Sequence, residues 1–227
     1  MQRYIESCAE GGGAESLVAL LGEVILEPAV HARFVNTLAR LEYVGVRKML
    51  KSRRAELLTL EGLQHVLDET VHSLRLKKAA TALAASAGAG AAVATFSSAD
   101  TLAGDAGEEY LQAIDHAAES LVSTTKDWTP ARRAEANYLL TSAAIEVRAQ
   151  VFYPIYDRML SERRVGFSVA AIARDEERHL SEMAEGLARV FGDWRGVFEP
   201  LLVAEERFFC TFMDAARAAL DRARAAA

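Results

Sequence analysis

Asp68-Glu69-Thr70-Val71-His72 and Asp175-Glu176-Glu177-Arg178-His179 carry the same Asp-Glu-x-x-His pattern, more than a hundred residues apart. Residues three positions apart on an α-helix project from one face, so the Glu and the His of each pattern can bind one metal centre together. The glutamate of the first pattern lies 27 residues after Glu42, and that of the second lies 30 residues after Glu146. Two Glu-x-x-His helices, with one Glu from each of two further helices, form the ligand set of a dinuclear metal site inside a four-helix bundle.

Prolines and capping residues divide the chain around these patterns into long helices. Pro28 favours the first turn of a helix that an apolar stripe extends to about Ser52, and Thr59 is a suitable N-cap for a helix to about Ser86. Thr129-Pro130 supplies the N-cap and first residue of a third helix, and a fourth starts at 166–168 and ends near 191–192. The sequence therefore predicts an all-α fold built on a four-helix bundle.

Further segments are expected to be accessory to this bundle. They are a short helix before Gly22 that follows a mobile glycine run at 11–13, a loop at 97–107, a helix from about Glu108 to Ser123, and a last helix from about Gly196. Helical periodicity runs through the chain without a strong internal boundary, which favours one domain over 1–227 with its bundle core at about 28–191.

The heights of the glutamates in the first helical hairpin agree with a common site. Glu42 lies ten residues before Ser52, and Glu69 lies ten residues after Thr59. In an antiparallel hairpin both would lie about 15 Å from the turn, at 1.5 Å per residue.

The second hairpin gives the same result only if Pro154 ends the third helix. A proline inside a helix removes a backbone hydrogen bond and kinks or ends the helix, which leaves a short connecting helix to about Ser161. Glu146 is then seven residues from Tyr153, and Glu176 is eight residues after Ser168. On this interpretation both pairs of glutamates are level.

Charge balance favours bound cations over a metal-free cluster. Burying unpaired charge costs several kcal/mol per ion, and four converging glutamates carry a charge of −4 that two divalent cations would cancel. The histidines must be neutral to act as ligands. Mixed oxygen and imidazole ligands suit iron or manganese better than zinc. The alternative is that these residues lie on solvated helix faces, but their order, spacing and level heights favour the metal site.

The aspartate of each pattern has a role of its own in this arrangement. A metal-bound imidazole usually donates its other N–H to a carboxylate. Asp68 is expected to reach His179 across the bundle, and Asp175 to reach His72.

This pattern resembles the ferritin-like di-iron carboxylate superfamily. The stretch Asp175-Glu176-Glu177-Arg178-His179 is close to the Asp/Glu-Glu-x-Arg-His motif of its oxygenase and oxidase branch, and the resemblance covers residues 28 to about 191. It implies a ferritin-like bundle with accessory helices that binds two iron ions, with a manganese–iron pair as the alternative. It also implies that Glu69 and Glu176 bridge the ions. Glu42 with His72 would complete one ion, and Glu146 with His179 the other.

Membership of a subfamily is a weaker resemblance. The run from Glu146 to His179, with Tyr153-Pro154 and Arg174-Asp175-Glu176, is similar to the small aldehyde-deformylating oxygenases. The connection between the second and third bundle helices is expected to be longer here. Quinone and transfer-RNA hydroxylases of the superfamily have comparable lengths. The chain has no Cys-x-x-Cys pair, so the rubredoxin domain of rubrerythrins is missing.

The resemblance implies an oxidoreductase that activates dioxygen to oxidise a small, apolar organic substrate. No flavin, NAD or iron–sulfur motif is visible in the sequence, so a separate reductase is expected as electron donor. One alternative is a ferroxidase that handles iron without an organic substrate, which a cage or large ring would support, whereas a monomer or homodimer would support an oxygenase. The other alternative is a bundle that metals stabilise without turnover.

Two residues near the six ligands have open roles. His65 lies four residues before Glu69 on the same face, and it is either a seventh ligand or a histidine that packs beside the site. Tyr153 lies seven residues after Glu146, and it either acts in catalysis through a radical or a hydrogen bond or packs in the core. The pairs Arg53-Arg54 and Arg163-Arg164 are solvated loop ends or a docking patch for a reductase, expected at one end of the bundle.

Composition limits the remaining possibilities. A net charge of −6 argues against a general nucleic-acid binder, and two distant cysteines, Cys8 and Cys210, suggest a reducing compartment, the cytoplasm. No signal-peptide pattern is visible at the N-terminus. The uncharged stretch 79–99 is long enough to span a bilayer, but its Ala, Gly, Ser and Thr content favours a helix end and a loop, with no membrane partner.

Overall fold

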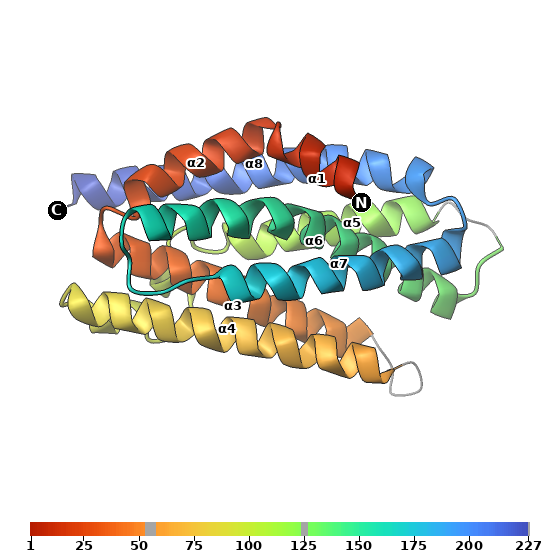
Figure 1. Cartoon of the computed structure of the whole chain (residues 1–227), viewed down its shortest axis with the longest axis horizontal. Coiled ribbons are helices and arrows are strands. Elements are labelled where there is room, and N and C mark those ends of the chain that lie inside the picture. The colour runs from red at the N-terminus through yellow and green to blue at the C-terminus, as the bar shows by residue number, and fades with distance from the viewer. Residues whose placement is uncertain (53–57, 124–126, 227) are drawn as a thin grey trace.

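The computed structural model describes residues 1–52, 58–123 and 127–226, which form eight α-helices and no strand. Four long helices make two antiparallel hairpins. The first is α3 (Pro28–Ser52) with α4 (Leu60–Ser86), and the second is α6 (Pro130–Glu162) with α7 (Ala170–Phe191), as Figure 1 shows. The all-α class predicted from the sequence is confirmed.

Local sequence signals explain where these helices begin. The Thr59 hydroxyl accepts a hydrogen bond from the Gly62 amide at 3.1 Å, and the Thr129 hydroxyl accepts one from the Arg132 amide at 3.2 Å. Each cap satisfies one of the amides that the first turn of a helix leaves without a partner. Both predicted N-caps are therefore confirmed.

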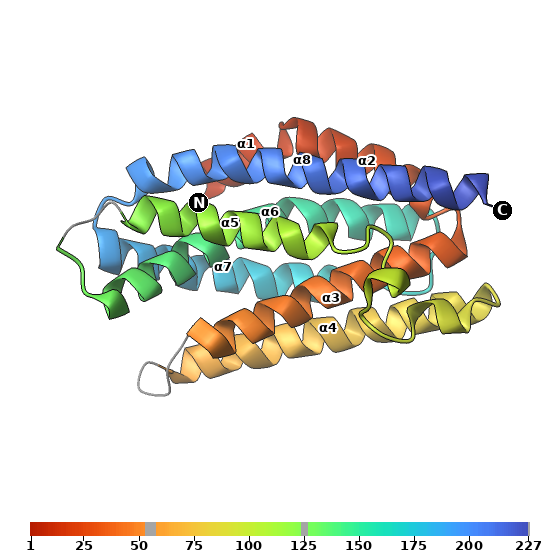
Figure 2. The same ribbon diagram turned by 180° about the vertical axis from the view of Figure 1, so that it is seen from behind.

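A second layer covers the α6 side of the bundle. It contains α1 (Gln2–Ala9), α2 (Gly12–Val24), α5 (Ala106–Ser123) and α8 (Arg195–Ala225), with α8 lying along α5 and α2 (Figures 1 and 2). The glycine run at 11–13 supplies the N-cap and the first residues of α2, which begins at Gly12. A Cβ on Gly13 would lie 2.8 Å from Phe209 Cδ1, so glycine here allows α2 to approach α8 closely.

The expectation that Pro154 ends a helix is wrong, because α6 continues through it to Glu162. The proline itself is exposed, whereas Tyr156, Met159 and Leu160 beyond it are buried. Burying each such side chain contributes about 1.5–3 kcal/mol, so three together exceed the cost of about 3 kcal/mol for an interior proline. There is therefore no separate connecting helix.

Glu146 and Glu176 of the second hairpin still lie at the same height in the bundle, although α6 does not end at Pro154. Glu146 lies about 24 Å from the end of α6, and Glu176 lies about 9 Å from the start of α7, at 1.5 Å per residue. The connection 163–169 runs back along the bundle and makes up the difference (Figure 1). Asp157 fixes this return, since its Oδ1 accepts hydrogen bonds from the Ser168 hydroxyl and the amides of Val169 and Ala170 at 2.6–3.1 Å.

The segment between the hairpins packs against α3. It contains two 3₁₀-helices, η2 (Gly90–Val93) and η3 (Ser98–Asp100), and the Asn36 side chain donates to the carbonyls of Thr95 and Asp100 at 2.9 and 2.8 Å. α5 then starts at Ala106, two residues before its expected start. None of the described helices combines the length and the apolar character needed to cross a membrane.

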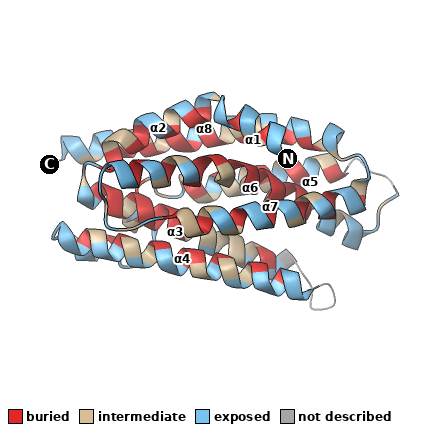
Figure 3. Ribbon diagram, viewed as in Figure 1, coloured by how far each residue is buried: buried red, intermediate tan, exposed pale blue. Residues whose placement is uncertain are grey.

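Burial is concentrated on α6, which has neighbours on several sides. Figure 3 shows buried positions along most of α6, whereas α4 has them on its inner face only. Cys8 and Cys210 are free thiols. Arg53 and Arg54 lie outside the described residues. Arg163 and Arg164 are exposed at the end of α6. The expectation that both arginine pairs lie at one end of the bundle stays a prediction.

Candidate metal centre

Seven side chains from the four bundle helices come together at mid-height in two groups that could hold metal ions. One group contains His65, Glu69, Glu146 and His179, and the other contains Glu42, Glu69, His72 and Glu176. Within each group the ligand atoms lie within 4.8 Å of one another, and Glu69 belongs to both. The six residues singled out in the sequence therefore converge, and His65 joins them. Their burial fits an internal site: Glu42 is partly buried and the others are at most 7% exposed.

The first group has two imidazoles facing two carboxylates. His65 Nε2 lies 3.3 Å from Glu69 Oε1 and 3.5 Å from Glu146 Oε1. His179 Nδ1 lies 3.3 Å and 3.8 Å from the same two oxygens. The two rings stack with their centroids 4.0 Å apart. His65 therefore lies within the group, and whether it is a ligand stays a prediction.

The second group leaves one nitrogen without a hydrogen bond. His72 is fully buried, and its Nδ1 lies 3.2 Å from Glu176 Oε1 but has no hydrogen-bond partner among the described residues. A buried polar atom without a partner costs free energy, because it loses its bonds to water. Since this nitrogen lies among the carboxylates, a metal ion bound there would satisfy it.

The outer nitrogens of both histidines face the predicted aspartates. His72 Nε2 lies 3.0 Å from Asp175 Oδ2, and His179 Nε2 lies 3.4 Å from Asp68 Oδ2. If each Nε2 carries the proton and donates it, Nδ1 is left as a lone pair pointing into the cluster. Asp68 is held in turn by Arg178 and Gln64. For His72 these contacts favour the tautomer of a metal ligand. His179 differs, because its Nδ1 lies 2.7 Å from Glu176 Oε2 and its Nε2 lies 3.2 Å from the Arg178 guanidinium. Without a metal ion, the shorter contact favours a proton on His179 Nδ1.

The pKa values show an excess of negative charge in the cluster. Burial raises the pKa of Glu146 well above its usual value, and the charges of Glu176 and Glu69 raise it further. The pKa of Glu42 is raised in the same way by burial and by Glu69 and Glu176. Burial lowers the pKa of His179, but hydrogen bonds to Glu176 and Glu69 outweigh it and raise the pKa to about 10. Protons thus supply the positive charge that cations would otherwise provide.

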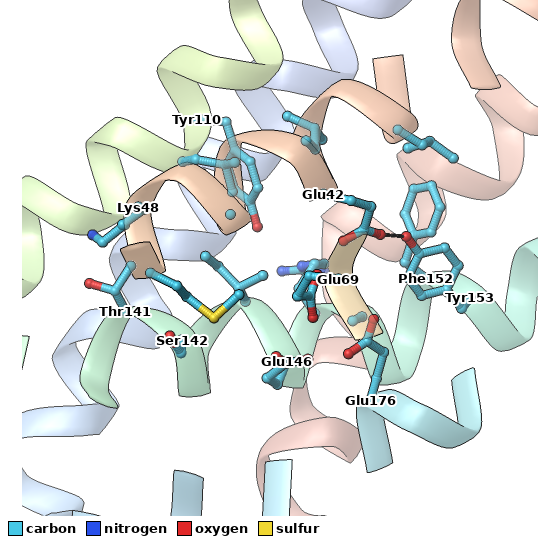
Figure 4. Close-up of a pocket in the computed structure, with 18 of the residues that line it drawn as sticks. Glu42, Lys48, Glu69, Tyr110, Thr141, Ser142, Glu146, Phe152, Tyr153 and Glu176 are labelled. Carbon is cyan, nitrogen blue, oxygen red and sulfur yellow. Dashed lines mark hydrogen bonds between the residues drawn. The ribbon is translucent and has the colours of Figure 1, made fainter. Parts of the chain in front are cut away.

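Tyr153 lies on α6 and donates its hydroxyl hydrogen to Glu42 Oε1 (Figure 4). Burial raises the pKa of Tyr153 well above its usual value, and the charge of Glu42 adds to the effect. The phenol therefore keeps its proton at neutral pH. It lies at the cluster and is not simply part of the apolar core.

An apolar cavity of about 130 Å³ adjoins the cluster. Glu42, His65, Glu69, Glu146 and Glu176 form one part of its wall, and the rest lies between α3, α5, α6 and α8. Its apolar lining includes Leu38, Leu41, Leu111, Ile145, Phe152, Phe209 and Phe212. A cavity of 150 Å³ with such a lining binds benzene, so this one admits a molecule of similar size beside the carboxylates.

A buried ion pair behind the cavity is a feature that the sequence analysis missed. Arg148 donates to both oxygens of Glu205 at 2.9 and 2.7 Å, and the Tyr110 hydroxyl donates to Oε1 of the same carboxylate at 2.6 Å. Cys8, Glu205 and Glu206 also lie close together, but Arg148 pairs with both carboxylates, and burial raises the pKa of the Cys8 thiol to about 12. The sequence did offer one indication of this ion pair, because Arg148 is a charged residue among the apolar residues of α6.

Comparisons of the chain with models of protein families, with curated proteins and with solved structures find no match.

Proposed function

We propose that the cluster binds two iron ions, that the chain is a ferritin-like di-iron carboxylate protein, and that it uses dioxygen to oxidise a small organic substrate. The observation that carries the proposal is the convergence of His72, whose Nδ1 has no hydrogen-bond partner among the described residues, with Glu42, Glu176 and the shared Glu69. The aspartate behind His72 adds support, because a hydrogen bond to Asp175 would orient this imidazole for ligation.

Charge supports two divalent ions over one. The four glutamates carry −4 when ionised, and neutral histidines add nothing, so two divalent cations bring the site to zero. In their absence the cluster has to take up protons, which is the state that the raised pKa values of Glu42 and Glu146 describe. Metal binding is therefore expected to release protons.

The donor set favours iron. Each group offers carboxylate oxygens and imidazole nitrogens with no thiolate, and the group around Glu146 combines two histidines with carboxylates. Two histidines and a carboxylate, with open positions left, are typical of non-haem Fe(II) oxygenases. Structural zinc sites are four-coordinate and usually richer in Cys or His. A manganese–iron pair has the same ligand preferences and is the alternative.

The bound pair would supply binding and reduction of dioxygen, and the protein's own residues would control what reaches it. The apolar cavity beside Glu42 and Glu146 would place a substrate next to the carboxylates. Tyr153 donates a hydrogen bond to Glu42 Oε1. Its hydroxyl proton could be transferred to a group in the site that gains negative charge during the reaction. The electrons would come from a separate reductase, since the sequence shows no flavin, NAD or iron–sulfur motif.

The test is oxygen consumption by the full chain loaded with Fe(II) under anaerobic conditions. We expect rapid uptake of O₂ that saturates at two Fe(II) per chain, with a transient visible absorption band. Glu176→Ala should abolish both signals. Glu177→Ala, the neighbouring exposed glutamate, should leave them unchanged and serves as the matched control.

Each other result would contradict part of the proposal. Uptake no faster than that of Fe(II) in buffer would contradict dioxygen activation, and a melting temperature that falls on chelation would then indicate a metal-stabilised bundle. Oxidation that continues far beyond two Fe(II) per chain, together with a large assembly, would indicate iron storage instead.

A further inference from the structure

A row of apolar side chains lies on the outward face of α4. Nine large apolar residues are exposed among the described residues, and four of them belong to this one helix. These four form the leucine row, which consists of Leu60, Leu63, Leu67 and Leu74, with exposed fractions of 79, 51, 54 and 51%. Apolar residues that are exposed singly are normal on a protein surface, but a contiguous patch of them marks an interaction site.

Helix geometry places the four leucines on one line. At 3.6 residues per turn they fall within an arc of about 60°, and the partly buried Val71 lies next to this arc. From Leu60 to Leu74 the row is about 21 Å long at 1.5 Å per residue. It ends there, because the next residues in the same arc are Lys78 and Thr81.

The rest of the described chain leaves this face open. α4 lies at the edge of the bundle in Figures 1 and 2, with α3 and α7 on either side of it, and Figure 3 shows exposed positions along its outer side. A partner that covers the leucine row would remove this apolar surface from water, which is the main driving force for association.

Charged residues on the α7 side of the row differ between its two ends. Near the start of α4, Glu61 lines a groove together with Glu185 of α7. Further along, Arg75 and Lys78 line a second groove with the first residues of α7. All four side chains are exposed, and the remaining charged residues of the first groove form ion pairs within the chain. This edge of the row is therefore acidic at one end and basic at the other.

The apolar row and these charges share one midpoint. The row from 60 to 74 is centred on Leu67, and Glu61 and Arg75 are centred on the next residue. A two-fold axis at this point makes two copies of α4 antiparallel and places the acidic end of each beside the basic end of the other. Such an axis also keeps the α7 side of one helix opposite the α7 side of the other. Glu61 of each copy would then face Arg75 of the other.

We propose that a second copy of this chain packs antiparallel along α4, so that the two leucine rows cover each other and two Glu61–Arg75 ion pairs form between the copies. A second copy matches both the apolar row and its charged edge by symmetry, whereas an unrelated partner would need a separate match to each. The inference does not rest on the proposed function, because no part of it involves a metal ion.

The size of the contact sets the expected strength. Two helices that touch over about 21 Å fall at or below the lower limit of about 1,200 Å² that stable interfaces bury. The dimer is therefore expected to exchange with the monomer, with a dissociation constant of about 1–100 μM. Sedimentation equilibrium of the full chain, from about 5 to 500 μM in the presence of a metal chelator, measures this constant.

A substitution at the centre of the row tests the surface. Leu67→Glu would place two carboxylates near the axis, and like charges that face each other in an interface are strongly unfavourable, so the dimer should weaken at least about ten-fold. Val203→Glu is the matched control, because Val203 is an apolar residue on α8 that is 65% exposed and lies away from α4. It should leave the dissociation constant unchanged.

An exchange of charges tests the antiparallel arrangement. Glu61→Arg and Arg75→Glu should each weaken the dimer about five-fold, since each replaces two attractive pairs with two repulsive ones at an exposed edge. The double variant restores opposite charges in both pairs, and its dissociation constant should return to within about two-fold of the wild type. Both positions are exposed, so circular dichroism should show the wild-type helix content for all three variants.

A chain that stays monomeric at the highest concentration would overturn the inference and indicate that a different partner covers the leucine row. A dimer that Leu67→Glu leaves unchanged, or that Val203→Glu weakens equally, would overturn it as well, because the copies would then meet elsewhere. Single charge exchanges without effect, or a double variant that does not recover, would contradict the antiparallel arrangement. Since every measurement is made without metal, failure of the proposed function leaves these results unaffected.

Discussion

At the scale of single residues, the candidate centre depends on the protons that its histidines carry. His72 is a useful ligand only if the hydrogen sits on Nε2, and Asp175, at 3.0 Å, is the group that would keep it there. Asp68 lies farther from His179, at 3.4 Å from Nε2, with Arg178 holding the carboxylate. Asp175 is therefore the positioning residue for the proposed ligand His72.

Asp175→Ala is expected to weaken metal binding about 10–100-fold, the usual effect of removing a group that orients a ligand. Asp175→Asn should recover part of the loss, because its side-chain oxygen can still accept from His72 Nε2. Competitive titration against a coloured chelator measures the affinity, with Glu177→Gln as the control. An affinity within two-fold of the wild type for Asp175→Ala would show that the contact does not orient His72.

At the scale of helices, the position of α7 depends on a return of the chain that no local pattern reveals. The connection 163–169 runs back along the bundle, and the Asp157 side chain joins α6 to the first amides of α7. This contact brings Glu176 to the height of Glu146. The contact is an N-cap supplied from another helix.

Asp157→Ala is expected to lower the free energy of unfolding by about 1–2 kcal/mol, the usual cost of losing a capping side chain. Asp157→Asn should lose less, because its amide oxygen can still accept from Val169 and Ala170. Urea titration followed by circular dichroism gives the values. No loss on changing to Ala would mean that water or the Ser168 hydroxyl caps α7 equally well.

The packing of α3 on α6 contributes a pH dependence through His31. This buried histidine lies 2.6 Å from the Tyr156 hydroxyl, and burial lowers its pKa to about 4. In the unfolded chain its pKa is near 6.5, so below that pH the unfolded state binds a proton that the folded state does not. This contribution to stability is therefore complete above pH 6.5 and is lost as the pH falls toward 4.

Between pH 7 and pH 4.5 the metal-free wild type should lose about 2 kcal/mol more stability than His31→Phe, whose ring keeps the contact with Tyr156. Denaturant titrations of both proteins in the presence of a chelator, across this range, give the difference. Because the other titrating groups are common to both proteins, their effects cancel. Parallel curves would show that His31 does not resist protonation in the folded state.

At the scale of the whole molecule, the stability of the bundle is expected to depend on what occupies its centre. In the absence of metal, burial raises the pKa of Glu42 and Glu146, and the charges of the neighbouring glutamates raise it further. Metal ions would reverse this repulsion and join the two hairpins. The same residues would then destabilise the metal-free bundle and stabilise the loaded one.

Glu146→Gln should therefore have opposite effects in the two states. Without metal it removes a repelled carboxylate and should raise the melting temperature. With Fe(II) the wild type should gain about 2.7 kcal/mol at a hundred-fold excess over the dissociation constant, and the variant should gain much less. Differential scanning calorimetry with and without a chelator measures both, and Glu177→Gln should behave as the wild type. A wild-type melting temperature that metal does not change would contradict a metal site at the centre.

The sequence predicts those parts of the fold that local chemistry determines. Thr59, Pro28 and Thr129 have capping preferences that do not depend on distant residues, and the i, i+3 spacing of Glu and His follows from helix geometry alone. The path of the chain past Pro154 depends instead on the burial of Tyr156 and Leu160, which only the folded molecule shows. A local rule for proline therefore gave the wrong helix end.

In the candidate site, too, some features could be predicted from the sequence and others are visible only in the folded molecule. The six proposed ligands could be selected from spacing, but the place of His65 depends on a 3.5 Å approach to Glu146 on another helix. The residues that line the cavity, such as Leu38 and Phe152, are ordinary helix residues by sequence. Cavities arise from how helices pack, which a single sequence does not reveal.

The most direct test of the central claim is anomalous X-ray diffraction at the iron edge from crystals of the chain grown anaerobically with Fe(II). We expect two anomalous peaks inside the bundle. One would lie among His65, Glu146 and His179, the other among Glu42, His72 and Glu176, with Glu69 adjacent to both. No peak in this cluster, or iron bound only at surface carboxylates, would contradict the metal centre and the oxidation chemistry proposed from it.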